Sequence, residues 1–231
     1  MSRPQAVIVG AGDGLSAALA REFARDHALT LAARTGAKMK DVAAETGAAT
    51  VLLDATDEAA VAAMIDGLAG PPRVVVYNPS ARLRGPVADL ALEDVRRAVE
   101  VTALGAFVVG KHAARAMLAA APMDGMRGTI LFTGASAGVK GFPRSAPFAM
   151  GKFASRGLAE SMARELHPEG IHVAWINIDG AIRTPGRSEP AAAPDSMLDP
   201  AAIARSYRHL VEQDRSAWTN EIALRPWVET F

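Results

Sequence analysis

Three glycines near the start of the chain form a pattern that suits a bound phosphate group. Gly10, Gly12 and Gly14 follow the apolar run of residues 6–9. A glycine at position 10 permits a backbone turn that a side chain would block, and one at position 14 lets the backbone approach a diphosphate closely. The helical pattern that begins at Leu15 would direct its free N–H groups and its positive dipole end toward the phosphates. The spacing therefore predicts a phosphate-binding loop, with a purely structural turn as the alternative.

The residue after the second apolar run, Arg34, indicates which dinucleotide such a loop would hold. A carboxylate at the end of residues 29–33 would bind the ribose hydroxyls of NAD, and none is present there. An arginine can instead form paired hydrogen bonds to the 2′-phosphate of NADP. Asp13, inside the glycine loop, argues in the other direction because its charge would repel that phosphate. The residues favour NADP(H) over NAD(H), with a solvated surface charge as the alternative role of Arg34.

The elements that would position these residues alternate between strand and helix. Short β-branched runs predict the strands, and longer alanine-rich patterns predict the helices between them. The strand runs are almost continuously apolar, as expected when both faces of a parallel sheet are buried. No repeat or linker divides the chain, so residues 1–231 are expected to form a single α/β domain, a Rossmann-like doubly wound parallel sheet of about seven strands with helices on both faces. The predicted strands are residues 6–9, 29–33, 50–53, 74–77, 129–132, 172–178 and a short last one at 221–224, and the predicted helices are residues 15–25, 38–45, 58–68, 92–120, 149–166 and 200–213.

Composition argues against several kinds of partner. The absence of cysteine removes disulfides, thiolate metal sites and cysteine nucleophiles, and the histidines are not at metal-ligand spacing. The chain carries 25 Lys and Arg residues against 25 Asp and Glu, so no net charge attracts it to nucleic acid or anionic lipid. No secretory leader is recognisable, and the apolar stretch 101–110 is far shorter than the ~20 residues of a membrane span. We expect a soluble cytoplasmic protein with no metal, nucleic-acid or membrane partner.

The segment 184–200 is unusual because it contains prolines at positions 185, 190, 194 and 200, with glycine and alanine between them. This composition predicts neither helix nor strand, and the segment is too long for a simple connection. We therefore expect a mobile lid over a small-molecule substrate, with a floppy insertion as the alternative.

Taken together, these features resemble the short-chain dehydrogenase/reductase family over almost the whole chain. Beyond the glycine loop, the matching positions are Asp54 with its neighbours, Asn78, Gly105, residues 132–138, Lys152 and residues 179–184. The resemblance implies an oxidoreductase with a nicotinamide cofactor. It also implies that Asp54 contacts the adenine edge, that Asn78 lines the cofactor cleft and that Thr184 contacts the nicotinamide carboxamide. The expected cofactor-binding residues are Gly10, Gly12, Asp13, Gly14, Leu15, Arg34, Asp54, Ala55, Asn78, Lys152 and Thr184.

The catalytic positions implied by the resemblance are mostly altered. The family pattern is Tyr-x-x-x-Lys, in which a lysine on the same helix face lowers the tyrosine pKa so that the phenol can exchange a proton. This chain has Phe148 at the tyrosine position and keeps Lys152. The serine position falls on Ala135, one residue before Ser136, and the position of the asparagine that supports the lysine falls on Thr102. The resemblance implies that Lys152 binds the nicotinamide ribose, and Lys152 and Ser136 are the candidate catalytic residues.

Three other hydroxyl groups are candidates to replace the missing phenol. Tyr77 ends the fourth predicted strand, and Tyr207 lies on the helix after the proline-rich segment. Ser145 lies seven residues before Lys152, the spacing at which enoyl reductases of the same superfamily carry their tyrosine.

The sequence leaves two functions open. The favoured one is an NAD(P)-dependent oxidoreductase that transfers a hydride to or from a small carbonyl, alcohol or activated double bond. The alternative is a catalytically silent dinucleotide-binding sensor or hetero-oligomer partner, because general acid catalysis is typically worth 10²–10⁴ in rate and its usual donor is absent. The resemblance also implies a homo-dimer or homo-tetramer that assembles through the helices at 92–120 and 149–166.

Overall fold

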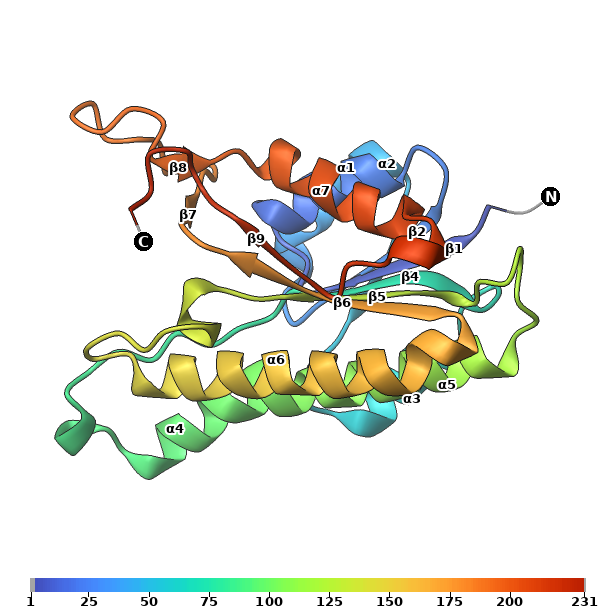
Figure 1. Cartoon of the computed structure of the whole chain (residues 1–231), viewed down its shortest axis with the longest axis horizontal. Helices are drawn as coiled ribbons and strands as arrows, with labels where there is room; N and C mark the ends of the chain where they lie inside the picture. Colours follow the sequence, from blue (N-terminus) through green and yellow to red (C-terminus); the bar gives the residue numbers. More distant parts are fainter. Residues whose placement is uncertain (1–2, 231) are drawn as a thin grey trace.

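A computed structural model describes residues 3–230 and contains one seven-stranded sheet (Figure 1). The strand order is β3-β2-β1-β4-β5-β6-β9, and every neighbouring pair is parallel. The predicted fold class and all seven predicted strands are therefore confirmed. The order reverses between β1 and β4, the position at which open α/β sheets form a ligand crevice. The strands are β1 (Gln5–Val9), β2 (Ala28–Ala33), β3 (Ala49–Leu52), β4 (Pro72–Tyr77), β5 (Gly128–Thr133), β6 (Ile171–Ile178) and β9 (Glu221–Leu224).

Helices cover both faces of the sheet. Figure 1 shows α1, α2 and α7 on one face and α3 to α6 on the other. Because alternate side chains of a strand point to opposite faces, β1 sends Ile8 into the core under the first group and Val7 and Val9 into the core under the second. The helices are α1 (Leu15–Phe23), α2 (Lys40–Thr46), α3 (Glu58–Asp66), α4 (Leu92–Val99), α5 (Gly105–Ala119), α6 (Ala146–Leu166) and α7 (Pro200–Glu212).

The long helix predicted for residues 92–120 is present but is not α-helical throughout, because a π-helical turn at Glu100–Leu104 lies between α4 and α5. In this turn the Gly105 N–H donates to the carbonyl of Glu100, five residues earlier. The hydroxyl of Tyr77 donates to the carbonyl of Val101 from the end of β4. A tertiary contact thus accompanies the π-helical turn. Across residues 3–230, no helix has the length and apolar character needed to cross a bilayer.

The proline-rich segment 184–200 is also more ordered than its composition predicts. Its end contains a short strand, β8 (Met197–Leu198), which pairs in parallel with β7 (Ala181–Ile182) just after β6. Both residues of β8 are buried. The prediction that this segment holds no strand is therefore wrong. The pairing anchors the far end of the segment at the carboxyl edge of the main sheet, where α7 begins with a cap from Asp199.

Candidate functional site

The glycine turn after β1 is held in place by residues that follow β4. Gly10 adopts φ +82°, and a Cβ at this position would lie 2.8 Å from the ring of Pro79. The side-chain amide of Asn78 donates to the Ser16 hydroxyl at 2.7 Å, and that hydroxyl donates to the Gly10 carbonyl at 2.9 Å. Position 10 therefore requires glycine for two reasons: the backbone is left-handed, and Pro79 leaves no room for a side chain.

The same turn is covered from the other side by the segment after β7. A Cβ at Gly14 would lie 3.1 Å from the methyl carbon of Thr184, so these two residues approach closely. Gly12 faces open space, and Asp13 is exposed. Leu15, the first residue of α1, lines the larger of two adjoining cavities described below.

A cavity of about 300 Å³ lies at the carboxyl ends of β1, β2 and β4. Its wall includes Arg34, the cation predicted to select the cofactor, and also Lys38. Both side chains are exposed. Lys38 was missed from the sequence because it was assigned only to a helix start, although its position four residues after Arg34 was visible. Other predicted cofactor residues in this wall are Gly10, Asp54, Ala55 and Asn78.

Asp54, predicted to meet adenine, already has protein partners at both carboxylate oxygens. Its Oδ1 accepts from the backbone N–H of Thr56 at 3.0 Å and from the Thr56 hydroxyl at 2.7 Å. Its Oδ2 accepts from Arg97 at 2.8 Å. These bonds, led by those from Thr56, lower the pKa of Asp54 below its ordinary value. The carboxylate is thereby fixed in its charged form in the cavity wall.

The second cavity has a volume of about 710 Å³, and Lys152 is part of its lining. Lys152 is only 3% exposed, and its Nζ donates to the carbonyl of Thr133 at 2.6 Å. Burial, with a smaller contribution from the charge of Arg82, lowers the pKa of Lys152 to about 7. Lys152 is one of the buried residues of α6, and its pKa is near neutral because of this burial.

Phe148 lies four residues before Lys152 on α6 and is buried against Ala135 and Ala137. Two cations lie near its ring: the Arg82 guanidinium carbon is 4.9 Å from the ring centroid, and Lys152 Nζ is 6.0 Å from it. Rings at these separations attract cations through their quadrupole. The aromatic residue at this position therefore contacts the ionic groups of the cavity, although it has no proton to give.

Two serines line the same cavity. Ser136 begins a short helical turn after β5 and is half-buried, and Ser145 lies immediately before α6 and is buried. The structure therefore brings the predicted catalytic residues Ser136 and Lys152 to one cavity. Thr102 is occupied elsewhere, since its hydroxyl oxygen accepts from the backbone N–H of Ala81 at 3.1 Å.

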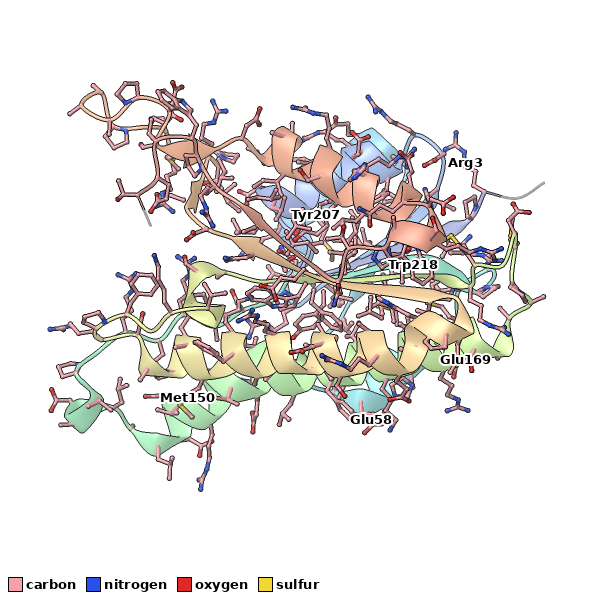
Figure 2. The ribbon with its side chains drawn as sticks, in the orientation of Figure 1. Arg3, Glu58, Met150, Glu169, Tyr207 and Trp218 are labelled. Atoms are coloured by element: carbon pink, nitrogen blue, oxygen red, sulfur yellow. The ribbon has the colours of Figure 1, made fainter. Side chains whose placement is uncertain are left out.

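The two tyrosines, both named as candidate proton donors, are poorly placed for that role. Tyr77 is buried with its hydroxyl donated to Val101, and burial raises its pKa well above the ordinary value. Tyr207 is fully buried between α7 and the sheet (Figure 2), where its hydroxyl shares a 2.9 Å hydrogen bond with the Thr133 hydroxyl. Burial raises the pKa of this phenol too. Neither tyrosine lines either of the two cavities.

Three arginines in the larger cavity were missed by the sequence analysis. Arg82 and Arg84 come from the segment after β4, and Arg187 comes from the segment after β7. The sequence showed basic residues at these positions but not that two segments about a hundred residues apart lie on one cavity.

Lys152 gives the first testable prediction, which concerns stability and pH. The lysine pKa is about 7 in the folded chain against 10.5 for the free side chain, so between these values the unfolded state binds more protons. The free energy of unfolding of the wild type should therefore rise relative to Lys152→Met above pH 7, by up to about 1.4 kcal/mol per pH unit. Below pH 7 the difference should level off. Urea denaturation from pH 6 to pH 9 measures it.

The exposed Lys40 provides the control, because a Lys40→Met chain should follow the wild-type pH profile. If the Lys152→Met and wild-type profiles run parallel across this range, the lysine is not held in a desolvated state.

Comparison with known proteins points to one family. The family model described as short chain dehydrogenase matches residues 4–193. A trans-4-hydroxycyclohexanecarboxylate dehydrogenase from Sinomonas cyclohexanicum is 31% identical over 196 residues, covering 78% of this chain and 73% of that protein. The crystal structure of a short-chain dehydrogenase from Rhodopseudomonas palustris is 34% identical, covers 97% of this chain and 99% of its own, and superposes with a TM-score of 0.81. An alcohol dehydrogenase from Thermococcus sibiricus, complexed with 5-hydroxy-NADP, shares the fold at 24% identity and a TM-score of 0.83, with 98% of each chain covered. The chain belongs to the short-chain dehydrogenase/reductase family.

Proposed function

We propose that the protein is an NADP(H)-dependent oxidoreductase that reduces or oxidises a small carbonyl, alcohol or activated double bond. The observation that carries the proposal is the adjacency of two cavities at the crevice between β1 and β4. One cavity has the Gly10 turn and Arg34 in its wall, the other has Lys152, and Asn78 lines both. The Sinomonas relative is named for the oxidation of a cyclic alcohol, which supports the same class of reaction.

The residues present fit a bound nicotinamide dinucleotide. The Gly10 turn has no room for a Cβ beside Pro79, and a diphosphate needs such a bare turn beside a helix N-terminus. Arg34 and Lys38 would bind the 2′-phosphate, Lys152 the nicotinamide ribose and Thr184 the carboxamide. When bound, the nicotinamide ring supplies or accepts the hydride. The NADP analogue in the Thermococcus structure supports this choice of cofactor.

Lys152 is our candidate for the proton donor, because the tyrosine position of the family is occupied by Phe148. A general acid works best when its pKa lies near the operating pH, and the pKa of this ammonium is about 7. Ser136 lines the same cavity and would hold the substrate oxygen by a hydrogen bond. A lysine alone is a less suitable proton donor to a developing alkoxide than a phenol paired with a lysine. We therefore expect slow turnover of simple ketones.

The cofactor preference can be measured by titrating NADPH and NADH into the wild type and an Arg34→Gln variant. NADPH should bind more tightly to the wild type, and the variant should lose roughly tenfold or more in NADPH affinity, since a charged hydrogen bond contributes about 1.5–3 kcal/mol. Affinity for NADH, which lacks the 2′-phosphate, is the internal control and should change little.

Turnover in the same samples separates the two functional classes. Oxidation of NADPH in the presence of a ketone or enone supports the enzyme. Binding without turnover over a panel of ketones, enones and alcohols would favour the silent sensor or partner, and binding of neither cofactor would contradict both.

A Phe148→Tyr variant tests whether the acid is the missing part of the site. The new phenol would lie one helical turn before Lys152, which lowers its pKa, and should raise ketone reduction by roughly 10²–10⁴. Phe142→Tyr is the matched control, because Phe142 lines the same cavity and adds the same hydroxyl elsewhere. If Phe148→Tyr reduces ketones no faster than Phe142→Tyr, the other residues of the cavity are not arranged for hydride transfer.

We also propose that the protein self-associates as a dimer or tetramer through α5 and α6. Apolar side chains on these helices and the π turn are exposed: Leu104 by 56%, Phe107 by 50%, Met150 by 53% and Phe153 by 45%. Figure 2 shows Met150 on the side of α6 that faces away from the sheet. Contiguous exposed apolar surface is typical of interaction sites. Sedimentation velocity at micromolar concentration should detect the assembly, and a Phe107→Lys/Phe153→Lys chain should be monomeric. A monomeric wild type would contradict this proposal.

A further inference from the structure

The larger cavity has a concentration of positive charge that binding of the cofactor at the glycine turn does not explain. Arg82, Arg84 and Arg187 line it together with Lys152. Within residues 3–230, no aspartate or glutamate is part of this lining, although the chain as a whole has as many acidic as basic residues. A cavity lined by charges of one sign concentrates ligands of the opposite sign.

The three arginines are not neutralised by neighbouring carboxylates. In the described part of the chain, ion pairs within 4.0 Å occupy many of the surface arginines, such as Arg21 with Glu45 and Arg164 with Glu160. Arg82, Arg84 and Arg187 take part in none of them. Desolvation, followed by the positive charges of Arg84 and Arg187, lowers the pKa of Arg82, so the other two arginines lie near enough for their charge to disfavour its protonated form. Cations that converge without counter-ions favour an anionic ligand.

The backbone that bears two of these arginines is fixed at both ends. The N–H of Ala81 donates to the Thr102 hydroxyl at 3.1 Å, and the N–H of Gly85 donates to the carbonyl of Arg144 at 3.1 Å. Arg82 and Arg84 lie between these anchors. The backbone that carries these two exposed side chains is therefore held in place before a ligand binds.

Arg82 has a further support inside the cavity. Its guanidinium lies over the ring of Phe148, 4.9 Å from the centroid, so the aromatic face holds the cation while its N–H groups remain available. Arg187 approaches from another segment, whose turn is closed by a hydrogen bond from its own N–H to the Thr184 carbonyl at 2.9 Å. The cations therefore come from two separate walls.

The arginines are separate from the residues expected to hold the adenosine half of the cofactor. That half corresponds to the smaller cavity, whose cations are Arg34 and Lys38. The two cavities share Asn78 and Ser80 but none of the arginines. A planar guanidinium forms paired hydrogen bonds to carboxylate or phosphate oxygens.

We propose that Arg82, Arg84 and Arg187 form a binding site for an anionic oxygen group of the substrate, a carboxylate or a phosphate, beside Phe148 and Lys152. That the anion belongs to a substrate rests on the proposed function. The anion site itself depends only on the three arginines and their cavity.

The experiment measures anion binding rather than catalysis. The full chain, saturated with NADPH, is titrated at constant ionic strength with sodium butyrate, inorganic phosphate and the uncharged isostere butyramide, and binding is followed by calorimetry and melting temperature. The same titrations are repeated without NADPH. The variant is Arg82→Gln/Arg84→Gln/Arg187→Gln. The control is Arg205→Gln, which removes one exposed positive charge from α7.

We expect saturable binding of butyrate or phosphate, no binding of butyramide and at least a tenfold loss of anion affinity in the triple variant. The control should bind like the wild type, and the stronger of the two anions identifies the substituent. Absence of saturable binding in the wild type, or unchanged binding in the triple variant, overturns the site.

Competition between the anion and NADPH, together with lost NADPH affinity in the triple variant, would assign the arginines to the cofactor and also overturn the proposal. Failure of the wild type to bind NADPH would contradict the proposed function instead. In that case the titrations without NADPH still decide whether the arginines bind an anion.

Discussion

The contact between the Gly10 turn and the residues that follow β4 is the constraint on which the site depends. Pro79 lies where a Cβ of Gly10 would be, and Asn78 reaches the Gly10 carbonyl through the Ser16 hydroxyl. These contacts join the first and fourth strands at the point where the strand order reverses. Because all the strands are parallel, their carboxyl ends then place both cavities at one edge of the sheet. The turn at Gly10 and Lys152 are thereby held in one rigid frame.

The larger cavity combines a desolvated lysine with an aromatic ring and three arginines. Burial of Lys152 disfavours its charge, and the proximity of Arg82 adds to the effect. The Arg82 guanidinium carbon and Lys152 Nζ lie 4.9 Å and 6.0 Å from the centroid of the Phe148 ring, which attracts both cations electrostatically. An anionic ligand would offset the mutual repulsion of the arginines and would favour the protonated form of Lys152. If Lys152 donates the proton as proposed, the charge of the ligand and proton donation are linked in this cavity.

The sequence predicted the sheet well because each buried strand is a short apolar run bounded by turn residues. It also singled out Lys152, which keeps its position in a recognisable motif, and Ser136, which lies one residue from the motif's serine position; both line the larger cavity. It did not predict the π turn at Glu100–Leu104, where the hydroxyl of Tyr77 contacts a carbonyl from another element. It also missed β8, whose pairing with β7 forms across the proline-rich segment. The arginine cluster was missed for the same reason, because only the folded chain brings its two segments together.

A crystal structure of the protein grown with NADP⁺ would show whether the crevice between β1 and β4 is the dinucleotide site. We expect the 2′-phosphate within hydrogen-bond distance of Arg34 or Lys38, the diphosphate at the Gly10–Gly14 turn and the nicotinamide ribose beside Lys152. The arginines of the larger cavity should remain free of cofactor oxygens. An empty crevice at saturating NADP⁺, or a dinucleotide bound elsewhere on the chain, would overturn this assignment.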